Sequence, residues 1–226
     1  MAFKTGGRKC KFESLENRQM MAGDVVGSVH AGTLTLRGDN FGNGITITAG
    51  ALPNSVLVTG VTQEGSPTNL DGVSNGATTY FGVTRGVTVK MKAGNDFLDI
   101  QDITINGLTK INMGIGVNEV NIDDAVLCKG LFLKTGRHAD TVTITDTEVT
   151  GKATIKTGAD CDHVTLEDSV FGALSVNLNE DNDELTTEHI SVTTETNLDG
   201  GWGINIFNDG ISNFYGGIYN RTRLNG

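Results

Sequence analysis

A repeat with a period of about 22 residues constrains this chain more than any other feature of its sequence. The segment 87–174 can be written as four equal rows (87–108, 109–130, 131–152 and 153–174) that align without a gap. Five columns keep their character in all four rows. The three apolar columns are Val89, Ile111, Leu133 and Ile155, then Leu98, Val120, Val142 and Val164, then Ile100, Ile122, Ile144 and Leu166. A fixed period of this size is typical of a solenoid or another repeat architecture.

Within each row, apolar and polar residues alternate in short runs that Gly, Asn or Asp bounds, which is typical of β-strands. The rows lack the helical return segment of leucine-rich repeats, and a β-propeller needs a period of about 40 residues. Strand–crossover–strand connections within a parallel sheet are right-handed in nearly all proteins. The sequence therefore predicts an all-β fold, a right-handed parallel β-helix (a solenoid) with coils of about 22 residues.

The predicted solenoid extends over residues 32–226, and residues 1–31 form a separate basic leader. At ~4.8 Å per coil, the body has room for roughly eight or nine coils, or a rod on the order of 40 Å. In the leader, Phe12, Leu15 and Met20 can share one face of a short capping helix. Large apolar side chains concentrate near the other end and predict an aromatic cap on the last coil: Trp202, Phe207, Phe214, Tyr215 and Tyr219.

Composition supports a β-rich chain with many tight turns, because it combines 31 glycines with only two prolines. No run of 18 apolar residues is present, so no membrane span is expected. The segment 1–23 is basic and has no continuous apolar run, so it does not match a Sec-type signal peptide.

Charge is distributed unevenly along the chain, whose net charge is −10. Residues 1–38 carry six basic and three acidic groups, whereas residues 39–209 carry nine basic and 24 acidic groups. An acidic body repels phosphate backbones, so nucleic acid is not an expected partner. The three cysteines (Cys10, Cys128 and Cys161) form no C-x-x-C pair and predict neither a zinc site nor a disulfide framework.

Two segments resemble one family of proteins. L-E-N-R-Q-M-M-A-G-D-V (Leu15 to Val25) resembles the L-E-x-R-x-L-L-x-G segment at the start of many predicted surface or extracellular proteins of planctomycete bacteria. V-T-V-K-M-K-A-G-N-D-F-L-D-I (87–100) resembles their V-T-V-x-x-x-A-G-N-D-x-V-x-I β-repeats. This resemblance implies a secreted or cell-surface location and a β-repeat architecture, and it implies no particular activity.

The segment A-G-N-D-F-L-D-I (93–100) also resembles half of a calcium-binding β-roll unit. The polar column Asp96, Asn118, Asp140 and Asp162 offers one such turn in each row, without the double glycine of calcium rolls. Calcium needs six or more oxygen ligands. We therefore expect a metal-free turn ladder and no cofactor, with Asp96, Asp140 and Asp162 as the calcium candidates.

Two further columns carry charge. The first comprises Asp102, Asp124, Asp146 and Asp168, and stacked like charges place it at a solvated corner. The second comprises Lys90, Asn112, Lys134 and Lys156. β-Helical polysaccharide lyases use carboxylates that hold calcium together with a Lys or Arg base, which this second column could supply. The favoured interpretation is a set of solvated lysines that balance the acidic columns.

These observations predict a monomeric, non-catalytic structural or interaction module, secreted or at the cell surface, with a cell-surface or carbohydrate contact as partner. The alternatives are a carbohydrate-active β-helix enzyme of the polysaccharide-lyase kind and a calcium-dependent adhesion module. The four histidines (His30, His138, His163 and His189) support neither a catalytic triad nor a metal set.

Overall fold

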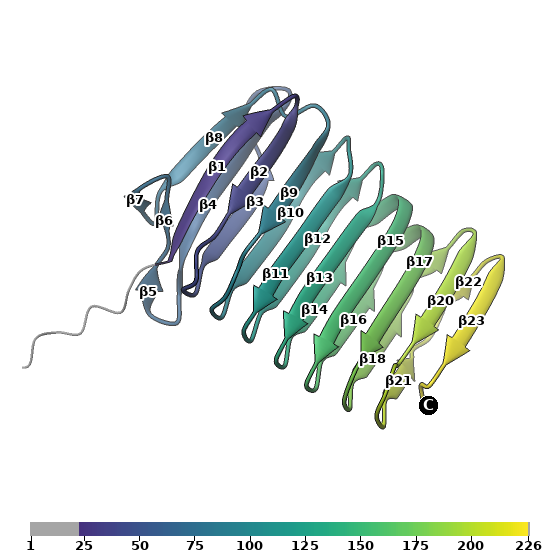
Figure 1. Ribbon diagram of the computed structural model, residues 1–226. Helices are drawn as coiled ribbons and strands as arrows, with labels where there is room; N and C mark the ends of the chain where they lie inside the picture. The colour runs from purple at the N-terminus through teal and green to yellow at the C-terminus, as the bar shows by residue number, and fades with distance from the viewer. Residues whose placement is uncertain (1–22, 226) are drawn as a thin grey trace, which may run out of the picture.

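The computed structural model describes residues 23–225, and every regular element among them is a β-strand. The strands stack into a rod with three faces (Figure 1). In the coils each face receives one strand segment per coil, and the chain turns a corner before it enters the next face. The predicted fold class is therefore confirmed.

Face A is the broad face toward the viewer in Figure 1. It consists of β1 (Asp24–His30), β2 (Thr33–Arg37), β9 (Gly86–Lys90), β11 (Thr109–Ile115), β13 (Leu131–Arg137), the second halves of β15 (Glu148–Ala159) and β17 (Val170–Asn179), β20 (Glu195–Asp199) and β23 (Ile218–Thr222).

Face B follows the next corner. It consists of β8 (Ala77–Phe81), β4 (Ser55–Gln63), β3 (Gly44–Ala49), the first halves of β10 (Phe97–Ile105) and β12 (Glu119–Leu127), β14 (Thr141–Thr145), β16 (His163–Glu167), β18 (Glu184–Glu188) and β21 (Ile206–Asp209). Face C is narrow and combines the remaining halves of β10, β12, β15 and β17 with β19 (Ser191–Val192) and β22 (Phe214–Tyr215).

The strand register reproduces the columns of the sequence repeat. Val120 lies opposite Val142 and Ile122 opposite Ile144, one coil apart. The side chains of the three apolar columns are at most 1% exposed and fill the interior of the rod. One coil is a residue shorter, because Ala153 pairs with Leu174 after an irregularity between Val149 and Lys152.

The number of regular coils is smaller than the sequence predicted. About six parallel coils follow Gly86, instead of eight or nine from residue 32. Between β2 and β9 the regular coil is interrupted by antiparallel pairing. Strand β4 pairs antiparallel with both β3 and β8. The alternating pattern at 45–48 and 56–62 specifies strands correctly, but a tight turn at 50–54 reverses the chain where a coil corner was expected.

The N-terminal end of the rod is closed by β-structure. β1 pairs antiparallel with β2 through a turn in which Ala31 and Gly32 have φ angles of 47° and 79°. The expected boundary between residues 31 and 32 thus falls inside this hairpin. Tyr80 of β8 is 8% exposed and packs against Gly27 of β1, where a Cβ would lie 2.0 Å from the tyrosine oxygen. The helix expected around Phe12 lies outside the described residues.

Two short strands, β6 (Asn69–Leu70) and β7 (Val73–Ser74), pair antiparallel and extend the edge of β1, while β5 (Ser66–Pro67) pairs with the end of β4. Asp71, in the turn after β6, accepts hydrogen bonds from the Tyr80 hydroxyl at 2.6 Å and from the Gly27 N–H at 2.9 Å. One carboxylate therefore joins β1 to β8 across this end.

The C-terminal end is covered by part of the predicted aromatic cap. Phe207 is 2% exposed, and the Arg221 guanidinium lies 4.9 Å from the centre of its ring. Tyr215 and Tyr219 stack with their ring centres 4.7 Å apart. Trp202 and Phe214 instead point outward and are 76% and 63% exposed. Only the inward members of the predicted cap lie over the last coil.

Candidate functional site

A ladder of Asp and Asn side chains runs along the corner between faces A and B. From Asp96 onward, the Oδ1 atom of each member accepts the backbone N–H of the preceding member, at 2.8–3.1 Å. Its members are Asn43, Asp96, Asn118, Asp140, Asp162, Asp183 and Asn205. The predicted turn ladder is therefore present, and it continues beyond the four members that the repeat identified.

The four aspartates of this ladder are at most 2% exposed, and their Oδ2 atoms have no hydrogen-bond partner. Burial raises the pKa of Asp96 to about 7 and that of Asp162 to about 7. Burial also raises the pKa of Asp140 to about 6 and that of Asp183 to about 6. These four carboxyl groups accept backbone N–H groups at the corner of the coil and are buried away from solvent.

The calcium candidates Asp96, Asp140 and Asp162 therefore use one carboxyl oxygen each to hold the backbone of the neighbouring coil. No group of three or more His, Cys, Asp or Glu side chains among residues 23–225 is arranged to hold a metal ion. Sequence reasoning missed Asn43, Asp183 and Asn205, because the N-terminal strands are antiparallel and one coil is a residue shorter.

The second Asp column lies at the corner between faces B and C and is exposed, as expected. Asp102, Asp124, Asp146 and Asp168 have φ angles of 51°, 45°, 46° and 47°. Asp tolerates this left-handed conformation better than most residues, which explains its recurrence at this corner. Among the described residues, these carboxylates make a single ion pair, between Asp168 and His189 at 3.4 Å.

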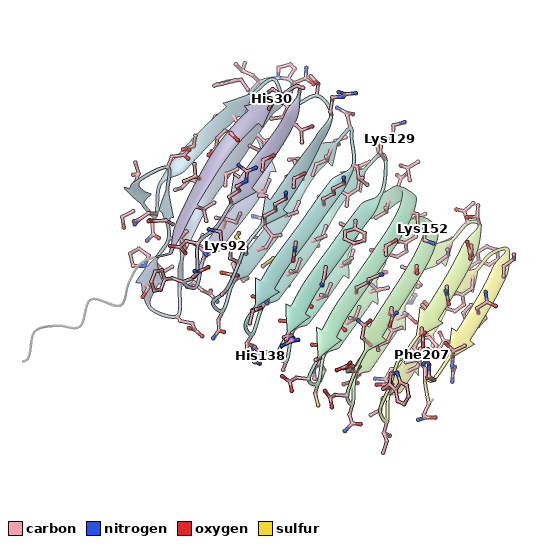
Figure 2. The ribbon with its side chains drawn as sticks, in the orientation of Figure 1. His30, Lys92, Lys129, His138, Lys152 and Phe207 are labelled. Carbon is pink, nitrogen blue, oxygen red and sulfur yellow. The ribbon has the colours of Figure 1, made fainter. Side chains whose placement is uncertain are left out.

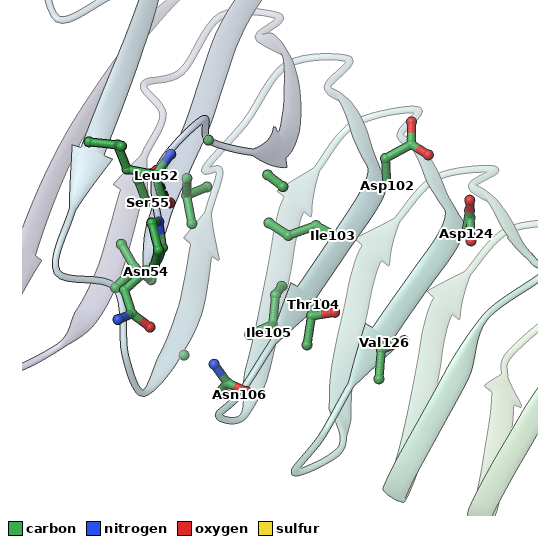
Figure 3. A pocket seen from close by; sticks show the side chains of 16 residues that line it. Leu52, Asn54, Ser55, Asp102, Ile103, Thr104, Ile105, Asn106, Asp124 and Val126 are labelled. Carbon is green, nitrogen blue, oxygen red and sulfur yellow. Dashed lines mark hydrogen bonds between the residues drawn. The ribbon is translucent and has the colours of Figure 1, made fainter.

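A groove of about 560 Å³ lies beneath the turn between β3 and β4. Figure 3 shows Leu52, Asn54 and Ser55 of this turn on one side and Asp102 and Asp124 on the other. The Ser55 hydroxyl donates to the Leu52 carbonyl at 2.6 Å and accepts the Leu52 N–H at 3.1 Å. Ser55 is thus engaged in holding the turn and has no basic partner among the described residues that would make it a nucleophile.

The other titratable side chains form local pairs. His138 lies 3.3 Å from Asp160, and His163 lies 3.4 Å from Glu184, each pair joining two neighbouring coils at an exposed position. Cys128 is half-buried and Cys161 is exposed, and both are free thiols. None of these pairs brings a third group into reach in the manner of a catalytic triad.

The most distinctive surface of the rod is face A, where basic residues gather. Figure 2 labels two of them, Lys92 and Lys152. The segments 33–37, 86–92, 109–115, 131–137 and 152–159 carry eight basic residues and no acidic one. They are Arg37, Lys90, Lys92, Lys110, Lys134, Arg137, Lys152 and Lys156, all exposed. Within residues 23–225, none of these eight side chains has an ion-pair or hydrogen-bond partner. We call this surface the basic face.

Face B has the opposite charge. From β10 to β21 its strand segments carry seven carboxylates and no Lys or Arg. They are Asp99, Glu119, Asp123, Glu167, Glu184, Glu188 and Asp209. Charge summed along the chain conceals this segregation, whereas charge summed by column over the repeat, separately for each outward position, reveals it.

A trough of about 780 Å³ runs along the basic face over β11, β13, β15 and β17. Its floor includes the glycine column Gly114, Gly136 and Gly158, and its sides carry basic, amide and apolar side chains. The side residues include Ile115, Phe132, Lys134, Arg137 and Lys156. Three members of the lysine column, Asn112, Lys134 and Lys156, thus border this trough, together with Arg137 and Phe132 from other columns.

Within residues 23–225, no helix has the length and apolar character needed to cross a membrane. Comparisons of the chain with protein-family models, with curated proteins and with solved structures found no match.

Proposed function

We propose that this chain is a non-catalytic structural and interaction module, secreted or displayed at the cell surface, in which a rigid β-solenoid presents charged faces to a partner. The observation that carries this proposal is the segregation of charge between the basic face and face B. The location rests on the resemblance of residues 15–25 and 87–100 to planctomycete surface proteins.

Segregated charge works against the stability of an isolated rod. Lys134 and Lys156 are direct neighbours in the ladder of strands, and so are Arg37 and Lys90. Like charges directly opposite one another on adjacent strands destabilise a sheet. Mixing the two signs would remove this cost, so a face of unpaired cations supports contact with an anionic partner.

The second candidate function, a carbohydrate-active enzyme, is favoured by one observation, the position of Lys134 and Lys156 beside the trough. A lyase of this kind needs carboxylates that hold calcium close to such a base. Among the residues that line the trough, Glu180 is the only carboxylate, so a calcium ion beside Lys134 and Lys156 would have one carboxylate ligand where it needs six or more oxygens.

The proposal is tested by incubating the purified full chain with acidic and neutral polysaccharides, with and without calcium, and measuring new reducing ends and the ultraviolet absorbance of unsaturated products. We expect neither product. Product formation that is lost in Lys134→Asn/Lys156→Asn would instead support the enzyme. Fractionation of the source cells with an antibody against the chain tests the location, and confinement to the cytoplasm would contradict it.

A further inference from the structure

We infer that the trough of the basic face binds an acidic polysaccharide, a chain of uronic acid residues that lies along the axis of the solenoid. This inference deepens the proposed function and rests on it, since it names the partner of the same face. It depends on three features of the trough: its unpaired cations, its glycine floor and its exposed apolar side chains.

The cations of the trough repeat along its length. Lys134 pairs in register with Lys156, and Arg137 lies three residues after Lys134 on the same strand. The three cations therefore lie on two neighbouring coils, ~4.8 Å apart along the axis, between Asn112 and Asn177 of the same column. A polymer with one carboxylate per sugar residue presents a comparable series of charges, so it can neutralise several unpaired cations at once.

The floor of the trough is fixed by the backbone. A Cβ on Gly136 would lie 1.6 Å from the carbonyl oxygen of Gly114, and a Cβ on Gly158 would lie 1.3 Å from that of Gly136. The close approach of successive coils therefore requires glycine, and Gly114 and Gly136 also have positive φ angles of 98° and 129°. No side chain can stand at these three positions, so the depression above them stays open to a ligand.

Apolar side chains are exposed beside these cations. Phe132 is 41% exposed and Ile115 is 53% exposed, and both line the trough. The neighbours of Phe132 in its column are Lys110 and Thr154, so the strand itself does not demand an aromatic residue at this position. The C–H face of a pyranose ring packs on an exposed aromatic ring, which a simple polyanion such as polyphosphate cannot do.

The basic zone ends on its C-terminal side. Glu180 lines that end of the trough, and its carboxylate repels the same polymer. Asp199 continues the Lys156 column two coils later through Asn177, where it is ion-paired with Arg223 at 2.6 Å. The cations of the trough span the two coils of β13 and β15, which at ~4.8 Å per coil accommodate roughly two sugar residues.

The experiment uses the full chain and oligogalacturonate as the probe, with binding measured by titration calorimetry at low ionic strength. Lys134→Asn/Lys156→Asn introduces the residue that already occupies this column at Asn112 and Asn177, and Phe132→Thr introduces the residue found at Thr154. We expect the double variant to bind about tenfold more weakly or worse, and Phe132→Thr to weaken binding several-fold. Added salt should also weaken binding.

The matched control is Lys129→Gln/Arg85→Gln, which removes the same charge outside the trough and should leave binding unchanged. Fully methyl-esterified oligogalacturonide keeps the sugar and removes the charge, and it should not bind. Equal weakening by the control pair, equal binding of the ester, no binding at all, or tighter binding of polyphosphate or single-stranded DNA would each overturn the inference. None of these results involves cleavage of a polysaccharide. Failure of this inference is therefore distinguishable from failure of the proposed function, which cleavage would contradict.

Discussion

The Oδ1 atom of Asp162 accepts the backbone N–H of Asp140, one coil earlier, at 2.8 Å, while its Oδ2 atom is buried without a partner. Asn118 occupies the same position of another coil and satisfies both ends of its side chain, because its Nδ2 donates to the Gly116 carbonyl at 2.8 Å. A carboxylate offers no donor for that second contact, whereas a protonated carboxyl or an amide does.

The first prediction concerns pH. Burial raises the pKa of Asp162 from 3.8 to about 7, so the folded state holds a proton that the unfolded chain has already released. The protonated carboxyl of Asp162 stabilises the folded state relative to its ionised form. This stabilisation is fully present below pH 3.8 and is lost as the pH rises through about 7. We therefore expect the free energy of unfolding to fall between pH 5 and pH 8, and Asp162→Asn to raise it at pH 8 by roughly 1–3 kcal/mol. Denaturant titrations at the two pH values measure both effects.

The control is Asp146→Asn, at an exposed corner where the left-handed conformation suits Asn as well as Asp. This variant should leave the pH dependence unchanged. If Asp162→Asn were less stable than the unmodified chain at pH 8, the buried Oδ2 atom of Asp162 would have to have a partner that the geometry of the ladder does not provide.

The sequence predicts the coils because every coil must place apolar side chains at the same inward positions. Val142 and Ile144 occupy these positions in one coil, and the gap-free repeat shows apolar residues at the same positions in its neighbours. The N-terminal strands do not repeat in this way, since β4 reverses direction to close the end of the rod. The alternation of apolar and polar residues in β4 predicts a strand, but it does not predict whether the neighbouring strand is parallel or antiparallel.

The trough was harder to predict than the coils. Lys134 and Lys156 are visible as a column, but Arg137 and Phe132 belong to other columns and join them only because the glycine at 136 opens the surface between them. Sequence spacing gives the order of side chains along a strand. It does not give the close approach of two backbones that leaves a depression.

The second prediction concerns the core. Ile144 is fully buried between Ile122 and Leu166 of the neighbouring coils. Ile144→Ala leaves a cavity that a rigid stack of coils cannot close, so we expect a loss of about 2–5 kcal/mol in the free energy of unfolding. Thr143→Ala, on the outward side of the same strand, should change it by less than about 0.5 kcal/mol. Similar losses in both variants would contradict the inward position of Ile144.

The third prediction concerns calcium. Asp96, Asp140 and Asp162 each use one oxygen to accept a backbone N–H, and a calcium ion requires six or more oxygen ligands. Millimolar calcium should therefore leave the melting temperature unchanged, since an ion that does not bind the folded state cannot stabilise it. Differential scanning calorimetry with calcium and with EDTA provides the measurement. A rise of several degrees that EDTA reverses would assign these aspartates as ligands.

The fourth prediction concerns the ends of the rod. Phe207 lies opposite Leu185 and Tyr215 opposite Val192, so the last coil covers the core side chains of the preceding one. Deletion of residues 202–226 exposes those side chains together with unpaired strand edges, which template association between chains. Size-exclusion chromatography with light scattering should show aggregates for this variant.

Deletion of residues 1–22 should leave a monodisperse, folded rod, because Tyr80 and β1 close the opposite end. A monodisperse C-terminal truncation would instead identify the aromatic residues of the last coil as a partner surface.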